Sequence, residues 1–293
     1  MRFLKFFSFL ATLISGTSVW SQSSLENLEI VGKPWAKGID FQPPVTELAR
    51  DLQWLDNFVF YIITVITLFV VGLLLYAAFR FSAKRNPEPA SFTHNSPLEV
   101  AWTLIPVVIL IFIGAFSVPV LFKQQIIPAG EVVIKATGNQ WYWNYEYVDH
   151  DFDFDSFMIG AGENRMSPET EAQLIAAGYS KDEFLLATDT ALVIPINKAV
   201  VVQVTGADVI HAWAMPAFGV KQDGVPGRLA QLWFKAEREG IYFGQCSELC
   251  GQSHAFMLIT VKVVSQEVYD KWLNGAITEY AGTPRSTKVA SLD

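Results

Sequence analysis

One short segment concentrates the side chains best suited to bind a metal ion. Between Cys246 and Met257, two thiols stand four residues apart, an imidazole at His254 follows, and a thioether ends the segment. Thiolate, imidazole and thioether together form the soft ligand set that selects copper over magnesium or calcium. A second imidazole, His211, follows a run of β-branched residues upstream. The pattern therefore predicts a copper centre.

Two other interpretations of this cluster stay open on spacing alone. Two cysteines this close in an oxidising compartment can form a disulfide. Two cysteines and two histidines can also bind zinc, although Met257 would be an unusual zinc ligand. A mononuclear blue-copper site uses one cysteine, two histidines and a weak methionine. The extra cysteine in this segment therefore suggests two metal ions bridged by two sulfurs.

The composition limits the kind of protein that holds this cluster. Of 293 residues, 51% are hydrophobic and only 17% are charged, against roughly 25% charged in an average soluble domain. This favours membrane segments and argues against a disordered chain. The net charge of −8 argues against nucleic-acid binding. Residues 130–293 hold 21 acidic and 12 basic side chains, and such a domain attracts cationic partners.

The N-terminus has the pattern of a secretory signal. Arg2 and Lys5 precede an apolar run that ends near Trp20, and the small residue Ser21 offers a cleavage point. The run is short for a membrane span, so we expect residues 1–21 to be a removed signal peptide rather than a retained anchor. Residues 22–56 are then predicted to be an irregular N-terminal segment that ends on a short helix near 45–54.

Two uncharged runs of 23 residues, 57–79 and 100–122, predict a transmembrane hairpin. Each would be about 34 Å long as a helix, enough to cross a hydrocarbon core of about 30 Å. The connecting loop, 80–99, carries three basic residues directly after the first run, which places it in the cytoplasm and both termini outside. Ser96 as N-cap, Pro97 and Glu99 predict a capping box at the start of the second helix.

The C-terminal part reads as a β-sandwich. Five β-branched runs, separated by turn residues, predict strands at sandwich-like intervals; they are residues 131–137, 191–196, 199–204, 240–244 and 257–264. An insert at 160–187 predicts one or two short helices at the edge. We expect this domain to cover residues 128–265. Residues 266–293 are predicted to form a helix, Gln266 to Leu273, and a loose tail.

Several segments of the chain together resemble those of a known protein family. The segment Cys246–Met257 is similar to the CuA loop of the cytochrome c oxidase subunit 2 family. The resemblance covers nearly the whole chain, including the hairpin, the aromatic run 139–147, the segment 208–213 and Val225–Arg228. The insert and the signal peptide resemble alphaproteobacterial members. The resemblance implies a two-helix transmembrane hairpin followed by an all-β, cupredoxin-like Greek-key sandwich that carries a binuclear copper centre, CuA.

The resemblance also implies a ligand set. In it, Cys246 and Cys250 bridge both coppers, and His211 and Met257 complete one copper. The other copper is completed by two groups, the His254 side chain and the main-chain carbonyl of Glu248. The Glu248 carboxylate would reach a magnesium or manganese ion shared with the catalytic subunit, a reasonable role for a hard oxygen ligand. Its alternative role is that of a capping or solvent-facing acid.

Electron entry and docking follow from the same resemblance. The family has its electron-entry tryptophan at the position of Trp141. No basic residue occurs between positions 136 and 164, and this acidic stretch would attract a lysine-rich cytochrome c. The implied docking acids are Glu146, Asp155 and Asp208, although an acidic run is most often a solvated face. The neighbouring aromatics Trp143 and Tyr145 could be core residues.

The implied function is electron entry into a proton-pumping haem–copper terminal oxidase of a bacterial inner membrane. The chain would cross the membrane twice, contact lipid, and hold both termini and the CuA domain in the periplasm. Subunit 1, which bears the haem, subunit 3 and cytochrome c are the implied partners, and this chain alone would carry only electron transfer. Glu99 would also lie at a proton-uptake path, a role compatible with capping. The alternatives are a quinol-oxidase subunit, which lacks the copper ligands, and a membrane-anchored copper carrier.

Overall fold

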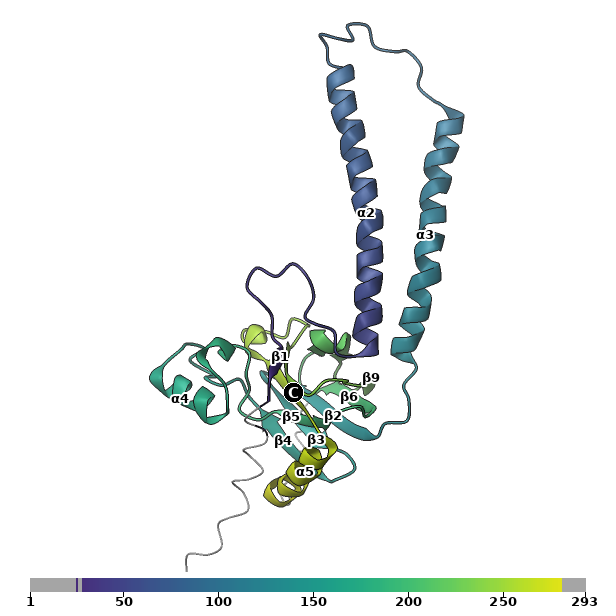
Figure 1. The fold of residues 1–293 in the computed structure, drawn as a ribbon. Helices are drawn as coiled ribbons and strands as arrows, with labels where there is room; N and C mark the ends of the chain where they lie inside the picture. The colour runs from purple at the N-terminus through teal and green to yellow at the C-terminus, as the bar shows by residue number, and fades with distance from the viewer. Residues whose placement is uncertain (1–24, 26–27, 281–293) are drawn as a thin grey trace, which may run out of the picture. The chain divides into compact units, whose positions relative to one another are not determined.

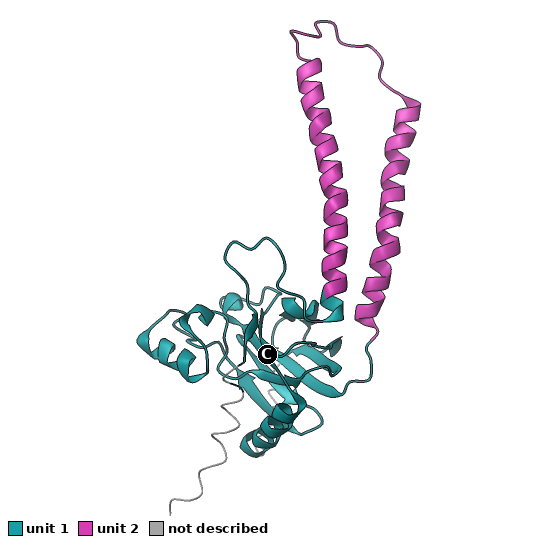
Figure 2. Ribbon diagram, viewed as in Figure 1, with its two compact units in different colours: residues 1–49, 127–293 teal, residues 50–126 magenta. Residues whose placement is uncertain are grey.

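The computed structural model describes residue 25 and residues 28–280, and these form two compact units. Figure 1 shows the elements in chain order, and Figure 2 separates the unit that contains residues 127–280 from the unit of residues 50–126. The predicted signal peptide and the residues after position 280 lie outside the described residues.

The helical unit consists of two long apolar helices. Helix α2 runs from Glu47 to Arg80 and helix α3 from Ser96 to Gln125, and both are long and apolar enough to span a membrane. They contain the two predicted spans. The expectation of a separate short helix near 45–54 is wrong, because no proline interrupts Glu47–Arg80 and the helix continues through this region.

Helix α3 begins one residue earlier than the capping pattern predicted. The N-cap is Asn95, not Ser96: the Asn95 side chain accepts a hydrogen bond from the Leu98 N–H at 3.2 Å. The Glu99 carboxylate accepts one from the Asn95 N–H at 3.1 Å. Asparagine is as good a cap as serine, and starting at Asn95 still leaves proline in the first turn. Glu99 therefore has a capping role, with a different partner.

Contacts between α2 and α3 hold the hairpin together at the end opposite the 80–99 loop. Asp51 and Lys123 form an ion pair at 2.6 Å. Beside it, the Trp54 ring lies 5.8 Å from the Phe116 ring, and Phe58 lies 5.2 Å from Phe116, measured between centroids. Tilted aromatic pairs at these distances are favourable beyond the area that they bury.

The other unit is a β-sandwich, as predicted. One sheet has the order β1-β10-β11-β5, with strands Ile30–Gly32, Gly240–Gln245, Leu258–Val264 and Leu192–Pro195. The second has the order β4-β3-β2-β6-β9, with strands Phe152–Ser156, Tyr142–Tyr147, Val132–Asn139, Val200–Gly206 and Ala230–Phe234. A two-stranded ribbon is formed by β7, His211–Met215, and β8, Val220–Gly224.

The five predicted strands are present as β2, β5, β6, β10 and β11. The N-terminal segment, expected to be irregular, also contributes a strand: β1 pairs in parallel with β10. Along β2, buried and half-buried residues alternate strictly, as expected of a strand with one face on a core. Trp143 and Tyr145 on β3 are fully buried, so these aromatics are core residues.

Short helices cover the edges of the sandwich. The insert forms α4, Pro168–Ala176, and the 3-10 turn η1, Lys181–Glu183, which confirms the prediction of one or two short helices. Two more 3-10 turns are η2, Pro216–Phe218, and η3, His254–Phe256. Helix α5 extends from Gln266 to Tyr280, beyond the predicted end, because later apolar residues such as Ile277 continue to pack on the core.

A buried hydroxyl joins the two sheets. The Tyr147 hydroxyl on β3 donates to the Val193 carbonyl at 2.6 Å and accepts from the Val193 N–H at 3.1 Å on β5. Tyr147 is 1% exposed, so water cannot replace these bonds. The fold therefore depends on a polar contact that links otherwise apolar layers.

We expect Tyr147→Phe to lower the free energy of unfolding by about 1–3 kcal/mol, because it leaves a buried N–H and carbonyl without partners. The matched change Tyr142→Phe, at a half-buried ring stacked on Phe157, should alter it by less than about 0.5 kcal/mol. Urea unfolding of the purified full chain in detergent, followed by near-ultraviolet circular dichroism, measures both. Equal stability of the two variants would contradict the role of the hydroxyl.

Candidate metal centre

Three segments from different parts of the chain meet at one end of the sandwich. The loop between β10 and β11 carries Cys246, Cys250 and His254, the first residue of β7 is His211, and Trp141 lies in the turn between β2 and β3. The run of β-branched residues that precedes His211 in the sequence forms β6, but His211 does not end that strand. It starts β7, because residues 207–210 bend away from β6 before the ribbon begins.

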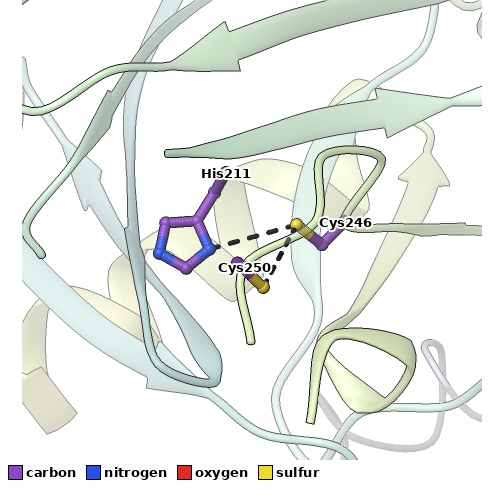
Figure 3. A group of neighbouring side chains, drawn as sticks. All are labelled: His211, Cys246 and Cys250. Atoms are coloured by element: carbon purple, nitrogen blue, oxygen red, sulfur yellow. Dashed lines mark hydrogen bonds between the residues drawn. The ribbon is translucent and has the colours of Figure 1, made fainter. Parts of the chain in front are cut away.

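The donor atoms of these residues converge. The Cys246 and Cys250 sulfurs are 3.8 Å apart, and the Cys246 sulfur is 4.0 Å from His211 Nδ1. The three ligand atoms, one from each of these residues, all lie within 4.8 Å of one another. Figure 3 shows the His211 ring and both sulfurs gathered at one point. On the other side, His254 Nδ1 lies 3.5 Å from the Cys250 sulfur. Both cysteines are free thiols, since a disulfide would require a sulfur separation of about 2 Å.

Main-chain hydrogen bonds hold the loop in place. The Cys246 N–H donates to the Met257 carbonyl at 2.9 Å, and the Ser247 N–H donates to the Ala212 carbonyl of β7 at 3.0 Å. The Glu248 carbonyl lies 3.3 Å from the Cys246 sulfur. The Met257 side chain is fully buried in the core that also contains both cysteines. The loop is therefore closed at its base and directed inward.

The His211 ring is fixed from two sides. Its Nε2 lies 2.8 Å from a carboxylate oxygen of Asp208, which leaves Nδ1 facing the thiols. The ring packs on Gly138 of β2, where a Cβ would come within 2.7 Å of His211 Cγ and Cδ2. The Trp143 ring lies edge-on, with centroids 6.0 Å apart. A carboxylate on the second nitrogen is the usual way in which proteins orient a metal-binding histidine.

Electrostatics distinguish the two thiols. Burial opposes ionisation of Cys246, but hydrogen bonds from His211 and the loop outweigh it and lower the pKa of this thiol. Burial and the charge of Cys246 raise the pKa of Cys250. Burial also disfavours the charged form of His211, yet its contacts with Cys246 and Asp208 raise the pKa of the ring. The site thus stabilises one thiolate by itself, and a bound cation would be needed to stabilise the second.

The donor chemistry fits copper. Two sulfurs and an imidazole nitrogen within 4.8 Å, all on buried residues, form a soft set in a water-poor site. A second imidazole, a carbonyl and a thioether lie in the same loop or at its ends. Calcium and magnesium prefer oxygen ligands, whereas the three donors gathered here are two sulfurs and a nitrogen.

The acidic residues predicted to dock a partner have different surroundings. Glu146 is paired with Lys135 at 3.2 Å. Asp155 is exposed and accepts a hydrogen bond from the Asn144 amide at 2.9 Å. Asp208 is bonded to His211. Trp141 is half-buried, and its indole N–H donates to the Cys250 carbonyl at 3.1 Å, so the predicted entry residue directly contacts the metal loop.

Family models match both units. The periplasmic domain of cytochrome c oxidase subunit II matches residues 132–264, and its transmembrane domain matches residues 34–120. The chain belongs to the cytochrome c oxidase subunit II family. The sandwich is accordingly cupredoxin-like, and the two apolar helices are membrane-spanning helices of a cytochrome c oxidase subunit.

Individual relatives agree with this placement. Cytochrome c oxidase subunit 2 of Cereibacter sphaeroides, an alphaproteobacterium, is 63% identical over 91% of this chain and 88% of the relative. A probable cytochrome c oxidase subunit 2 of Rickettsia felis is 43% identical over 82% of this chain and 71% of the relative. The crystal structure of the periplasmic domain of subunit II from Bradyrhizobium japonicum is 45% identical, covering 53% of this chain and all of that one, with a TM-score of 0.44. The identity to the Cereibacter sphaeroides relative shows that the chain is a subunit of a cytochrome c oxidase, an oxidoreductase.

Sequence reasoning missed the residues that support the site. Gly138 had no visible signal, because only the packed structure shows that His211 lies against it. The contact between Asp208 and His211 could have been suspected from their spacing of three residues, but the aspartate was assigned only to docking. Gln140 was treated as part of an aromatic run, although its side chain bonds to the Cys250 carbonyl at 2.8 Å.

We expect Gly138→Ala to reduce the copper bound per chain to less than half of the wild-type value, because the new methyl group would displace the His211 ring. Gly275→Ala on α5 is the control, since a Cβ there meets nothing within 4 Å. Atomic absorption of the purified full chain after copper loading measures this. Wild-type copper content in Gly138→Ala would show that His211 does not need this space.

Proposed function

We propose that this chain is the electron-entry subunit of its oxidase: it receives electrons from cytochrome c and passes them to haem in subunit 1. The convergence of His211, Cys246 and Cys250 on one buried point carries this proposal. Two copper ions would be held there by His211, Cys246, Glu248 O, Cys250, His254 and Met257. When bound, such a pair supplies an acceptor that takes up and releases one electron at a time.

The chain contributes rigidity to this chemistry. Two sulfurs 3.8 Å apart can bridge a metal pair, and the hydrogen bonds from Cys246 and Ser247 fix the base of the loop. Burial of both cysteines and of Met257 excludes water, which would otherwise have to reorganise around a changing charge. A site of this kind favours electron transfer and needs no general acid or base.

Trp141 connects this site to the surface. Its ring is half-buried, so one part can meet a donor while the N–H bonds to the Cys250 carbonyl at 3.1 Å. A single hydrogen bond then separates the proposed entry residue from a proposed ligand. This arrangement supports electron entry through Trp141.

The acidic face supports docking of a lysine-rich cytochrome c. Asn144 donates to Asp153 and Asp155 and so holds two carboxylates side by side. Glu146 is partly neutralised by Lys135, so we assign Asp155 the larger share of the attraction, with Glu146 and Asp208 contributing. Charges at the rim of an interface act mainly on the association rate and its dependence on salt.

The remaining roles belong to the assembled oxidase. We propose that the half-buried Glu248 directs its carboxylate to a magnesium or manganese ion shared with subunit 1, and that Glu99 adds proton uptake to its capping role. Subunit 1 and subunit 3 would contact the helices within a bacterial inner membrane, alongside lipid. The basic loop 80–99 would face the cytoplasm, with both termini and the copper domain in the periplasm after removal of residues 1–21.

The experiment that tests this function is copper loading of the purified full chain in detergent, with metal analysis and X-band EPR. We expect two coppers per chain and a seven-line hyperfine pattern, because one unpaired electron shared by two equivalent copper nuclei gives seven lines. Cys250→Ser should abolish this pattern, since one bridging sulfur is lost. One exchangeable copper with four lines would instead favour the carrier. No copper, from a folded chain, would favour the quinol-oxidase form.

Steady-state oxidation of cytochrome c by the purified oxidase should distinguish the electron-entry role of Trp141 from the docking role of Asp155. We expect Trp141→Phe to lower kcat with little change in KM, because the hydrogen bond to the loop is lost while the acidic face remains. Asp155→Asn should raise KM about twofold to fivefold at low salt, since one unit charge at contact is worth about 1 kcal/mol in water. Trp272→Phe, at a half-buried indole on α5, is the control. An effect of Asp155→Asn that persists at high salt would contradict electrostatic docking.

A further inference from the structure

Gln140 contacts both the loop that carries the cysteines and Asp208, which orients His211. It lies in the turn between β2 and β3, directly before Trp141. Its side-chain amide donates to the Cys250 carbonyl at 2.8 Å, and its main-chain N–H donates to the Asp208 carboxylate at 2.7 Å. One residue thus bonds to the cysteine loop through its side chain and to the histidine side of the site through its backbone.

Asp208 transmits the second contact. The oxygen that accepts from Gln140 is Oδ2, whereas Oδ1 accepts from the Val209 N–H at 2.7 Å and lies 2.8 Å from His211 Nε2. Both carboxylate oxygens are therefore engaged, and the aspartate cannot rotate without losing its bond to the ring. A continuous path of hydrogen bonds runs from Cys250 through Gln140 and Asp208 to His211.

The side-chain amide of Gln140 packs closely against Gly251. Gly251, the residue after Cys250, has φ +118°, a conformation that favours glycine, and a Cβ there would lie 3.0 Å from Gln140 Nε2. The same Cβ would lie 3.1 Å from the Trp141 ring. Glycine at this position thus lets the amide and the indole approach the loop together. Such close packing would be unnecessary for a side chain that only faced a docking partner.

We propose that Gln140 is a positioning residue that fixes the distance between the cysteine loop and His211. The inference rests on the proposed function and deepens it, because it concerns the same copper centre. Trp141 shares the Cys250 carbonyl as acceptor, so the loop keeps one bond when the amide is lost. The expected effect of replacing Gln140 is therefore a distorted centre rather than an unfolded domain.

The test compares Gln140→Met with Gln266→Met in the purified, copper-loaded full chain. Methionine keeps the length of the side chain and removes the N–H donor. Gln266 is the matched control, because its amide also donates one hydrogen bond of 2.8 Å, to Asp270 on α5. We expect Gln140→Met to release copper to a chelator about tenfold to a hundredfold faster, the usual cost of losing a group that orients metal ligands. Its copper hyperfine splitting and midpoint potential should also change, and Gln266→Met should match the wild type in all three.

A second variant covers the case in which Gln140→Met does not fold, as judged by circular dichroism. Gln140→Glu has the same shape but presents a carboxylate oxygen to the Cys250 carbonyl, so it should change the same three quantities in a folded chain. Wild-type copper release, splitting and potential in a folded variant would overturn the proposal. If the wild-type chain itself lacks the two-copper spectrum, the proposed function fails, and the role of Gln140 fails with it.

Discussion

The separation of 3.8 Å between the sulfurs of Cys246 and Cys250 is the constraint on which the centre depends. Two thiolates at this distance repel each other, and burial together with the charge of Cys246 raises the pKa of Cys250. The fold holds them together nevertheless, because the base of the loop is bonded to β7 and to the residue that precedes β11. The apo protein therefore holds its donors close together, and bound cations would relieve the repulsion.

The sandwich supplies the rigidity that such a loop requires. Antiparallel pairing of β10 with β11 brings the two ends of the loop together, with Gln245 opposite Leu258. The β2–β3 turn reaches the same end of the sandwich through Gln140 and Trp141, which bond to the Cys250 carbonyl. Strands far apart in the sequence thus fix one short loop. Under the proposed function, a site built this way would change little on receiving an electron, since its donors are held by packing and not by the metal alone.

The parts that could be predicted from the sequence are those with a local signal. The spacing of cysteine, histidine and methionine indicates copper, and uncharged runs indicate spans, because ligand chemistry and hydropathy need no knowledge of tertiary contacts. Strand β1 could not be found in this way: it has three residues, and its pairing with β10 comes from more than 200 residues downstream. The predicted N-cap of α3 was one residue away from the observed one, because Asn95 and Ser96 are both good caps and only the backbone conformation decides between them.

The residues that support the site could not be predicted from the sequence for the same reason, because their contacts are tertiary. Asp208 is one of them, and it can both orient His211 and contribute to the proposed docking. Its oxygens are fully engaged with Gln140, Val209 and His211, which leaves little capacity for direct bonds to a partner. Its side chain is still 36% exposed, and Coulomb attraction depends on net charge and distance rather than on free lone pairs. A carboxylate can therefore hold a ligand in place through its hydrogen bonds while its charge attracts a basic protein from several ångströms away. Under the proposed function, the acidic face and the metal centre share this residue, so a cytochrome c would be guided toward the same end of the sandwich as the proposed entry residue Trp141.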